Sequence, residues 1–105
     1  MQKSMIMESA RFAPEKMQKV SLFSSSRFFC DVYGLEPGQE QNPHAHEASD
    51  KVYVVLDGEG RFRIGSEEES LGPGWAVLAP AGSDHAVTNP GPARLTMLVF
   101  MAPPP

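Results

Sequence analysis

The stretch GWAVLAPAGSDHAVTN covers residues 74–89 and joins two short apolar segments through a turn that ends at a histidine. Residues 75–78 have the composition of a short strand. Pro80 and Gly82 favour a tight turn, because proline fixes φ and glycine tolerates positive φ. We expect this turn to deliver His85 into the interior of a β-structure, and Asn89 to bond backbone in the turn that follows.

Apolar segments of a few residues alternate with turn signals along most of the remaining chain. The expected strands cover 20–23, 28–35, 52–56, 62–64, 75–78 and 95–101. The chain contains 10 Pro and 9 Gly in 105 residues, which favours short strands and tight turns over a helical bundle. We therefore predict an all-β sandwich or closed barrel. Residues 52–56 are nearly all β-branched or apolar and are expected to be central and buried on both faces.

The domain organisation follows from the same distribution of apolar segments and turn residues. Residues 1–18 show no sustained strand or helix period and are predicted to form an N-terminal arm. Residues 19–101 form the predicted barrel domain. Residues 102–105 end in three prolines, which lack backbone donors, so a short extended tail is expected.

All three histidines fall in two windows. His44 and His46 are two residues apart, so on a strand both face the same side. His85 on another strand would complete a site of three nitrogens with open positions, suited to one divalent transition metal such as Fe, Zn, Ni, Mn or Cu. The alternative is a pair of solvated surface histidines.

The spacing of these histidines resembles that of the cupin superfamily. Gly38, His44, His46 and Gly58 match the family's first motif, apart from its glutamate. The second motif is matched at every defined position, by the following residues: Gly74, Pro80, Gly82, His85 and Asn89. The resemblance spans about half of the chain and implies a double-stranded β-helix, or jelly roll, of one cupin domain.

The departure from this pattern lies at residue 51, where the family has a glutamate and this chain has Lys51. A protonated amine cannot coordinate a metal. Lys51 could turn out to solvent, point into the barrel beside a metal and attract an anion, or join the histidines in a metal-free anion pocket. Asp50 could replace the missing carboxylate only through a bulge. Tyr53 shares the strand face of Lys51 and could donate a proton or hydrogen bond, although a core position with a satisfied hydroxyl is the commoner role for such a tyrosine.

The function implied by the resemblance is that of a small metal-dependent enzyme. Three-histidine cupins with open metal positions include dioxygenases, so we expect an oxygenase or isomerase acting on an anionic small molecule, with His44, His46 and His85 as metal ligands and Lys51 and Tyr53 as catalytic residues. The alternative is a cupin that binds or senses a small molecule without turnover. Homodimerisation through packed sheets is also expected.

Charge and composition exclude several partners. The formal net charge is -4, which argues against nucleic acid and anionic membrane surfaces as partners. No apolar run approaches the roughly 18 residues of a membrane span, and the N-terminus lacks a secretory pattern, so a cytoplasmic protein is expected. Cys30, the single cysteine, is expected to be a small buried residue. Trp75 is expected in the core, and Glu67–Glu69 in an acidic turn.

Overall fold

The chain folds into nine β-strands preceded by one short helix. The computed structural model describes the backbone of residues 1–105 and every side chain except those of Pro43 and His44. The elements are α1 Ile6–Ser9, β1 Gln18–Ser24, β2 Phe29–Leu35, β3 Glu40–His44, β4 Asp50–Asp57, β5 Gly60–Ile64, β6 Glu67–Leu71, β7 Ala76–Ala79, β8 His85–Thr88 and β9 Leu95–Ala102.

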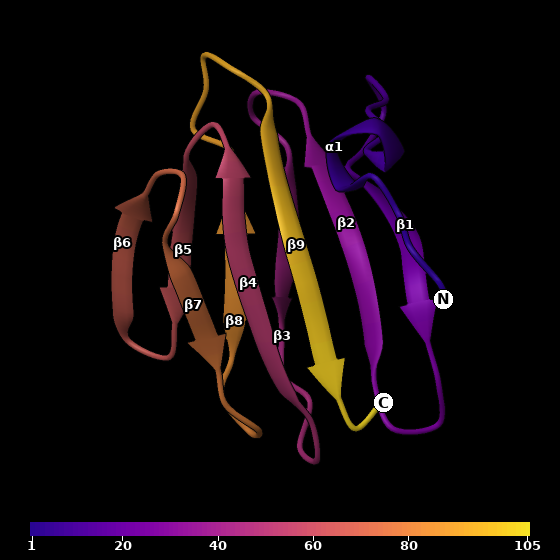
Figure 1. Ribbon diagram of the computed structural model, residues 1–105. Helices are drawn as coiled ribbons and strands as arrows, with labels where there is room; N and C mark the ends of the chain where they lie inside the picture. The colour runs from indigo at the N-terminus through magenta and orange to yellow at the C-terminus, as the bar shows by residue number, and fades with distance from the viewer.

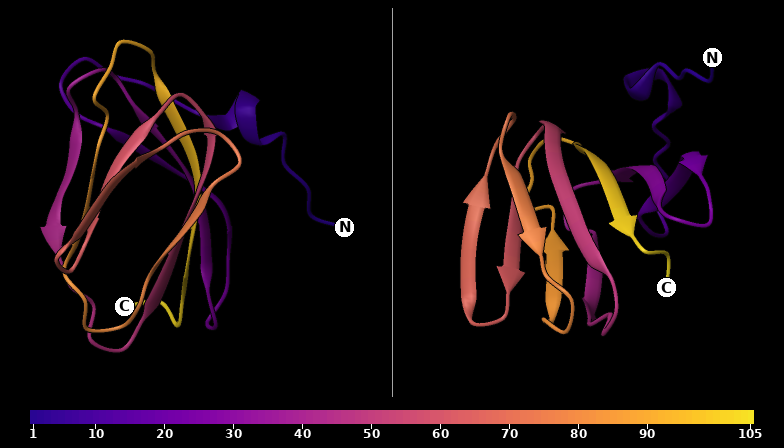
Figure 2. Two further views of the ribbon diagram at one scale, coloured as in Figure 1. Left: turned by 90° about the vertical axis from the view of Figure 1, so that its left-hand side faces the viewer. Right: turned by 60° about the horizontal axis from the view of Figure 1, so that its bottom comes forward.

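Two antiparallel sheets face each other (Figure 1). One sheet has the order β1-β2-β9-β4-β7 and the other has the order β3-β8-β5-β6. The view along the barrel in Figure 2 shows the two layers and the N-terminal segment leaving the barrel on one side. This arrangement confirms the predicted all-β jelly roll.

The core lies between the sheets because alternate residues of each strand point inward. On β4, Tyr53 and Val55 are fully buried, whereas Val52 and Val54 are half-buried on the outer face. The prediction that this segment is central is confirmed, since β4 lies between β9 and β7. The prediction that both faces are fully buried is wrong. The buried core cluster consists of Tyr33, Leu35, Tyr53, Val55, Phe62, Ala79, Val87, Leu95, Met97 and Val99.

The strands β3, β6 and β8 are absent from the apolar segments expected to form strands, although His44 and His85 were expected to lie on strands and do so, on β3 and β8. The acidic segment Glu67–Glu69 belongs to β6 rather than to a turn. It is an edge strand paired with β5, where Arg61 Nε lies 2.9 Å from Glu68 Oε1. A strand with a solvent-exposed outer face tolerates charged residues, and charged side chains are common on the edge strands of sheets.

Two further expectations about single residues are wrong. Trp75 is 60% exposed, because it lies in the turn just before β7 rather than inside the barrel. Cys30 is only half-buried and lies on β2 in register with Phe100, which is exposed. Its side chain therefore belongs to the outer face of the five-stranded sheet, since residues in register point to the same side.

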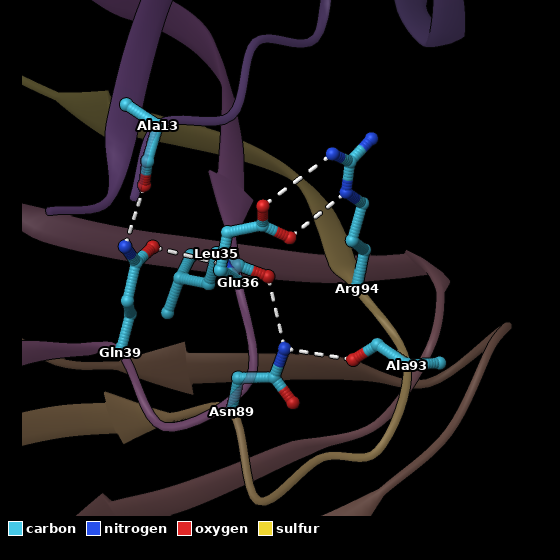
Figure 3. A network of polar contacts seen from close by, with 7 residues as sticks. All are labelled: Ala13, Leu35, Glu36, Gln39, Asn89, Ala93 and Arg94. Carbon is cyan, nitrogen blue, oxygen red and sulfur yellow. Dashed lines mark hydrogen bonds and ion pairs between the residues drawn. The ribbon is translucent and has the colours of Figure 1, made fainter. Parts of the chain in front are cut away.

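The N-terminal arm is anchored to the barrel by residues 11–13. A Cβ at Gly34 would overlap the carbonyl oxygen of Arg11, so only glycine lets the arm cross β2 this closely. The guanidinium of Arg94 lies 4.4 Å from the ring centroid of Phe12. Gln39 Nε2 donates to the carbonyl of Ala13 at 2.7 Å (Figure 3). In the described part of the chain, no helix is long and apolar enough to cross a membrane.

Candidate functional site

Lys51 points into the barrel. It is 2% exposed and shares the inner face of β4 with Tyr53. Its backbone is in register with Met101 on β9 and Ala79 on β7, both buried. An outward, solvated Lys51 is therefore wrong, because the alternation of β4 fixes the residue on the buried side.

One amide oxygen organises the polar groups around this lysine. Gln41 Oε1 accepts a hydrogen bond from Lys51 Nζ at 3.3 Å and another from the Tyr53 hydroxyl at 2.6 Å. Gln41 Nε2 in turn lies 3.5 Å from the Tyr33 hydroxyl, which accepts from it. The ammonium also lies 5.2 Å and 5.1 Å from the ring centroids of Tyr33 and Tyr53. The direct partners of Lys51 are thus an uncharged amide and two aromatic faces.

Burial shifts the ionisation of these groups. Loss of hydration is the main cause that lowers the pKa of Lys51, and the positive charge of Lys19 acts in the same direction, whereas the Asp31 carboxylate opposes the shift; together they bring the pKa to about 7. Burial raises the pKa of Tyr33 to about 12 and also raises the pKa of Tyr53. At neutral pH both phenols are therefore uncharged and Lys51 exchanges between ammonium and amine.

Asp50 does not replace the missing carboxylate. Its side chain is exposed, and Oδ1 accepts the backbone N–H of Ala81 at 2.8 Å. The register of β4 against β7 and β9 is regular around residues 50–54, so no bulge turns Asp50 toward Lys51. The carboxylate instead ties the start of β4 to the turn before His85.

Two of the three predicted metal ligands lie side by side. The rings of His46 and His85 have centroids 5.8 Å apart. His85 is buried on β8, and its Nδ1 lies 3.1 Å from the carbonyl of Ser83. Donation from Nδ1 to that carbonyl leaves Nε2 as the nitrogen that carries a lone pair, the form a metal ligand requires. Gly82 N–H donates to the carbonyl of His46 at 2.9 Å, which joins the two histidine-bearing segments.

His44 completes the predicted set, but its side chain lies outside the described residues. Its backbone is in register with His85 across the β3–β8 pair. Among the side chains that the structure describes, no group of three or more His, Cys, Asp or Glu is arranged to hold a metal ion. The three-histidine metal site therefore stays a prediction.

An open pocket of about 510 Å³ reaches Lys51 and His46 from one side of the barrel. Lysine, amide and imidazole groups share its wall with apolar side chains. The lining residues are Lys19, Phe29, Tyr33, Gln41, Asn42, His46, Lys51, Met101 and Pro105. Tyr53 lies behind this wall, with its ring 5.5 Å from that of Phe62 and 6.2 Å from that of His85.

Four polar residues of this region were not identified from the sequence: Lys19, Asp31, Tyr33 and Gln41. Asp31 and Tyr33 share one face of β2, so strand alternation offered a signal for both. No sequence pattern indicated that Gln41 faces the barrel, because the pairing register of β3 with β8 shifts between Gln41 and His44. Strict alternation counted back from His44 would place Gln41 on the opposite face.

Asn89 has the structural role expected of it (Figure 3). Its Nδ2 donates to the carbonyls of Leu35 and Ala93, each at 2.9 Å, and its Oδ1 accepts from Gly91 N–H at 2.8 Å. Nearby, Arg94 Nε lies 2.8 Å from Glu36 Oε1. These contacts join the ends of β2 and β8 to the loop before β9, at the end of the barrel opposite to the Asp50–Ala81 hydrogen bond.

Comparison with known proteins supports the fold and identifies the family. A cupin domain model matches residues 31–101. The chain is similar to the crystal structure of TT1209 from Thermus thermophilus, with 47% identity, complete coverage of both chains and a TM-score of 0.97. An RmlC-like cupin protein from Desulfovibrio desulfuricans is 27% identical over 100% of this chain and 99% of its own, with a TM-score of 0.88. A curated relative, the oxalate-binding protein of Thermotoga maritima, is 26% identical over 81% of this chain and 69% of its own. The barrel, its motifs and these matches together show that this chain belongs to the cupin family.

Proposed function

We propose that this cupin binds a small carboxylate anion in its barrel, beside a divalent transition metal held by His44, His46 and His85. The observation that carries the proposal is the position of Lys51, a buried amine at the wall of a pocket that His46 also lines. Among the described side chains, the Lys51 ammonium donates a hydrogen bond to the neutral amide of Gln41, and a bound carboxylate would add a direct ionic partner.

The second cation of the pocket supports the same class of ligand. Lys19 Nζ lies 5.3 Å from the ring centroid of Tyr33, the ring that Lys51 also contacts. The pocket lining thus includes two lysines, and the Asp31 carboxylate acts on Lys51 from nearby on β2. The name of the Thermotoga relative, an oxalate-binding protein, agrees with a small dicarboxylate as the first ligand to test.

The described histidines fit a metal ligand set. His85 presents Nε2 from a buried position, and the His46 ring lies against it. When bound, the metal would supply Lewis acidity or, for iron, a site for oxygen chemistry. The residues of this chain would bind the substrate carboxylate through Lys51, orient Gln41 through the Tyr53 hydroxyl, and exclude water with the apolar wall of the pocket. This combination of a metal site and a substrate-binding lysine is the basis for proposing a metal-dependent oxygenase or isomerase.

Binding without turnover is the second candidate function. Lys51 stands where the cupin pattern has a glutamate, and the Tyr53 hydroxyl is already engaged by Gln41. The site therefore holds a strong anion-binding group but few groups with a free role in proton transfer. A protein that binds the anion and leaves it unchanged would favour this candidate.

The test is an oxalate titration by isothermal calorimetry at pH 7. We expect Lys51→Met to weaken binding at least about tenfold, because a charge-assisted hydrogen bond is lost from a buried site. Lys16→Met, which removes an exposed lysine elsewhere, is the matched control and should bind as the wild type does. Equal affinity in wild type and Lys51→Met would reject the proposal.

We also propose that the outer face of the five-stranded sheet forms a homodimer interface. Two rows of residues in register cross this sheet and consist only of apolar side chains and Cys30. The rows are Val20, Val32, Leu98, Val54 and Ala76, and Cys30, Phe100, Val52 and Leu78. Leu78 is 56% and Phe100 38% exposed. Val32 is fully buried within the single chain, so the accessible part of these rows consists of Leu78, Phe100 and the partly exposed residues around them. An accessible apolar patch of this kind is typical of a protein interface, and a second copy of the same sheet can bury it.

A further inference from the structure

The amine of Lys51 also has the surroundings of a nucleophile. We propose, on the basis of the anion pocket above, that Lys51 forms an imine with the carbonyl carbon of a small 2-oxo acid, whose carboxylate is bound by Lys19. Lysines that form such bonds in proteins lie in desolvated pockets or beside a second cation, and Lys51 has both features.

The geometry presents the nitrogen to the pocket. Nζ is held by one hydrogen bond to Gln41 Oε1 at 3.3 Å, and the rings of Tyr33 and Tyr53 flank it. Phe29 and Met101 line the same pocket, which gives the bound carbonyl an apolar environment.

Lys19 supplies the second point of recognition. It belongs to β1, whereas Lys51 belongs to β4, and both lie against Tyr33 and line the pocket. Lys19 is exposed and keeps its charge accessible to solvent and ligand. A molecule with a carboxylate next to a carbonyl can therefore place one group at each lysine.

The charged and titratable groups that face Lys51 come from several strands. Among the described side chains they are Lys19 from β1, Asp31 and Tyr33 from β2, Tyr53 from β4 itself, and His46 from the segment between β3 and β4, which lines the same pocket. Burial and Lys19 lower the pKa of Lys51 to about 7, and Asp31 acts in the opposite direction. A substantial share of Lys51 is thus the free amine at neutral pH, while an ordinary exposed lysine is almost entirely protonated.

The reaction balances without a further reagent. The neutral Nζ attacks the carbonyl carbon, a C–N bond forms, and the carbonyl π electrons move to oxygen. The carbinolamine then loses its oxygen as water, which takes both amine protons, and a C=N bond remains. The imine reverts to free lysine and oxo acid on addition of water.

The test is reductive trapping of the full-length protein at pH 7, with glyoxylate as probe and sodium cyanoborohydride as reductant. Peptide mapping by mass spectrometry measures labelling at each lysine. We expect Lys51 to be labelled at least about tenfold faster than Lys3 and Lys16, because its amine is far less protonated. Labelling of Lys51 at or below the rate of Lys16 would overturn the proposal.

Two variants separate the roles of the lysines. Lys19→Met should slow labelling of Lys51 by both probes, because the loss of the Lys19 charge raises the pKa of Lys51. Glyoxylate labelling should slow severalfold more than labelling by acetaldehyde, which lacks a carboxylate. An equal effect on both probes overturns the assignment of Lys19. Lys51→Arg should abolish the barrel adduct while retaining a cation.

Oxalate, which cannot form an imine, distinguishes this inference from the proposed function. Oxalate binding that depends on Lys51, together with no glyoxylate adduct, would reject the imine and retain the anion site. Absence of both would reject both.

Discussion

The regular alternation of β4 buries Lys51 beside an amide and two aromatic rings, and this burial is the basis of the chemistry proposed for the residue. Among the described side chains, the amine donates a hydrogen bond to Gln41 and lies beside the rings of Tyr33 and Tyr53. Motif spacing identified the position of Lys51 but left open whether its side chain faces solvent or the barrel, and the burial of the side chain decides for the barrel. Its partner Gln41 could not be predicted, because a bulge in β3 changes which residues face inward.

The ionisation of Lys51 predicts a pH-dependent stability. Its pKa is about 7 in the folded protein and near the ordinary 10.5 in the unfolded chain. Between these values the unfolded chain binds more protons, so the free energy of unfolding rises with pH; below pH 7 both states are protonated and the full cost remains. From pH 7 to pH 9 we expect a gain of about 2 kcal/mol in the wild type.

Urea unfolding at pH 7 and pH 9, followed by circular dichroism, measures this gain. In Lys51→Met the gain should disappear, and in the exposed-site control Lys16→Met it should persist. Identical pH dependence in wild type and Lys51→Met would contradict burial of a titrating amine.

A second prediction concerns the acceptor of the lysine. Gln41→Glu places a carboxylate within 3.3 Å of Nζ, where it raises the pKa of Lys51 and satisfies its charge internally. We expect at least about tenfold weaker oxalate binding by calorimetry, because the ligand must displace an existing counter-ion. Gln18→Glu, on β1 outside the lining of the pocket, should bind oxalate as the wild type does. Unchanged affinity in Gln41→Glu would show that oxalate binds elsewhere.

At the scale of elements, tight turns position the strands that carry the site. Gly58 ends β4 with φ +81°, and a Cβ there would overlap the carbonyl oxygen of Arg94. Gly74 also has positive φ, +92°, but open space surrounds it. The sequence predicted that glycines lie at these turns, because the turn signals are local. It could not predict which glycine is tightly packed, since that depends on a strand far away in the chain.

The two glycines form a matched pair for mutation. Gly74→Ala should cost on the order of 1 kcal/mol in the free energy of unfolding, from backbone strain alone. Gly58→Ala should cost more, at least about 2 kcal/mol, because it adds a clash with the backbone next to β9. Urea denaturation at one pH compares them, and equal losses would mean that the Arg94 contact does not constrain the turn.

The edge strand β6 shows why some elements were missed. Its residues Glu67–Glu69 are charged and exposed, so no period of apolar residues marks it. Pairing with β5 and the Arg61–Glu68 ion pair define it as a strand. By contrast, the apolar segments that became β2, β4, β5 and β9 were predictable, because their side chains build the core.

At the scale of the whole molecule, the two sheets differ in their outer surfaces. The five-stranded sheet carries two apolar rows on its outer face, whereas the four-stranded sheet exposes charged residues such as Arg61, Arg63 and Glu68. This asymmetry favours association of two copies through the five-stranded sheets, and it leaves the other sheet in solvent.

The predicted dimer can be disrupted by charge. Phe100→Lys with Leu78→Lys should convert the protein to a monomer in size-exclusion chromatography with light scattering, because like charges meet across a two-fold interface. Glu68→Lys together with Glu69→Lys on the other sheet should leave the mass unchanged. A wild type that is monomeric at micromolar concentration would reject the interface.

The most direct test of the account is an NMR titration of Lys51 itself, with the Cε and Nζ signals assigned by comparison with Lys51→Arg. We predict a midpoint near pH 7 in the metal-free protein, and a higher midpoint with saturating oxalate, because a bound anion stabilises the ammonium. A midpoint near 10.5 that oxalate does not move would contradict both the burial of the amine and its role as the anion-binding group of this cupin.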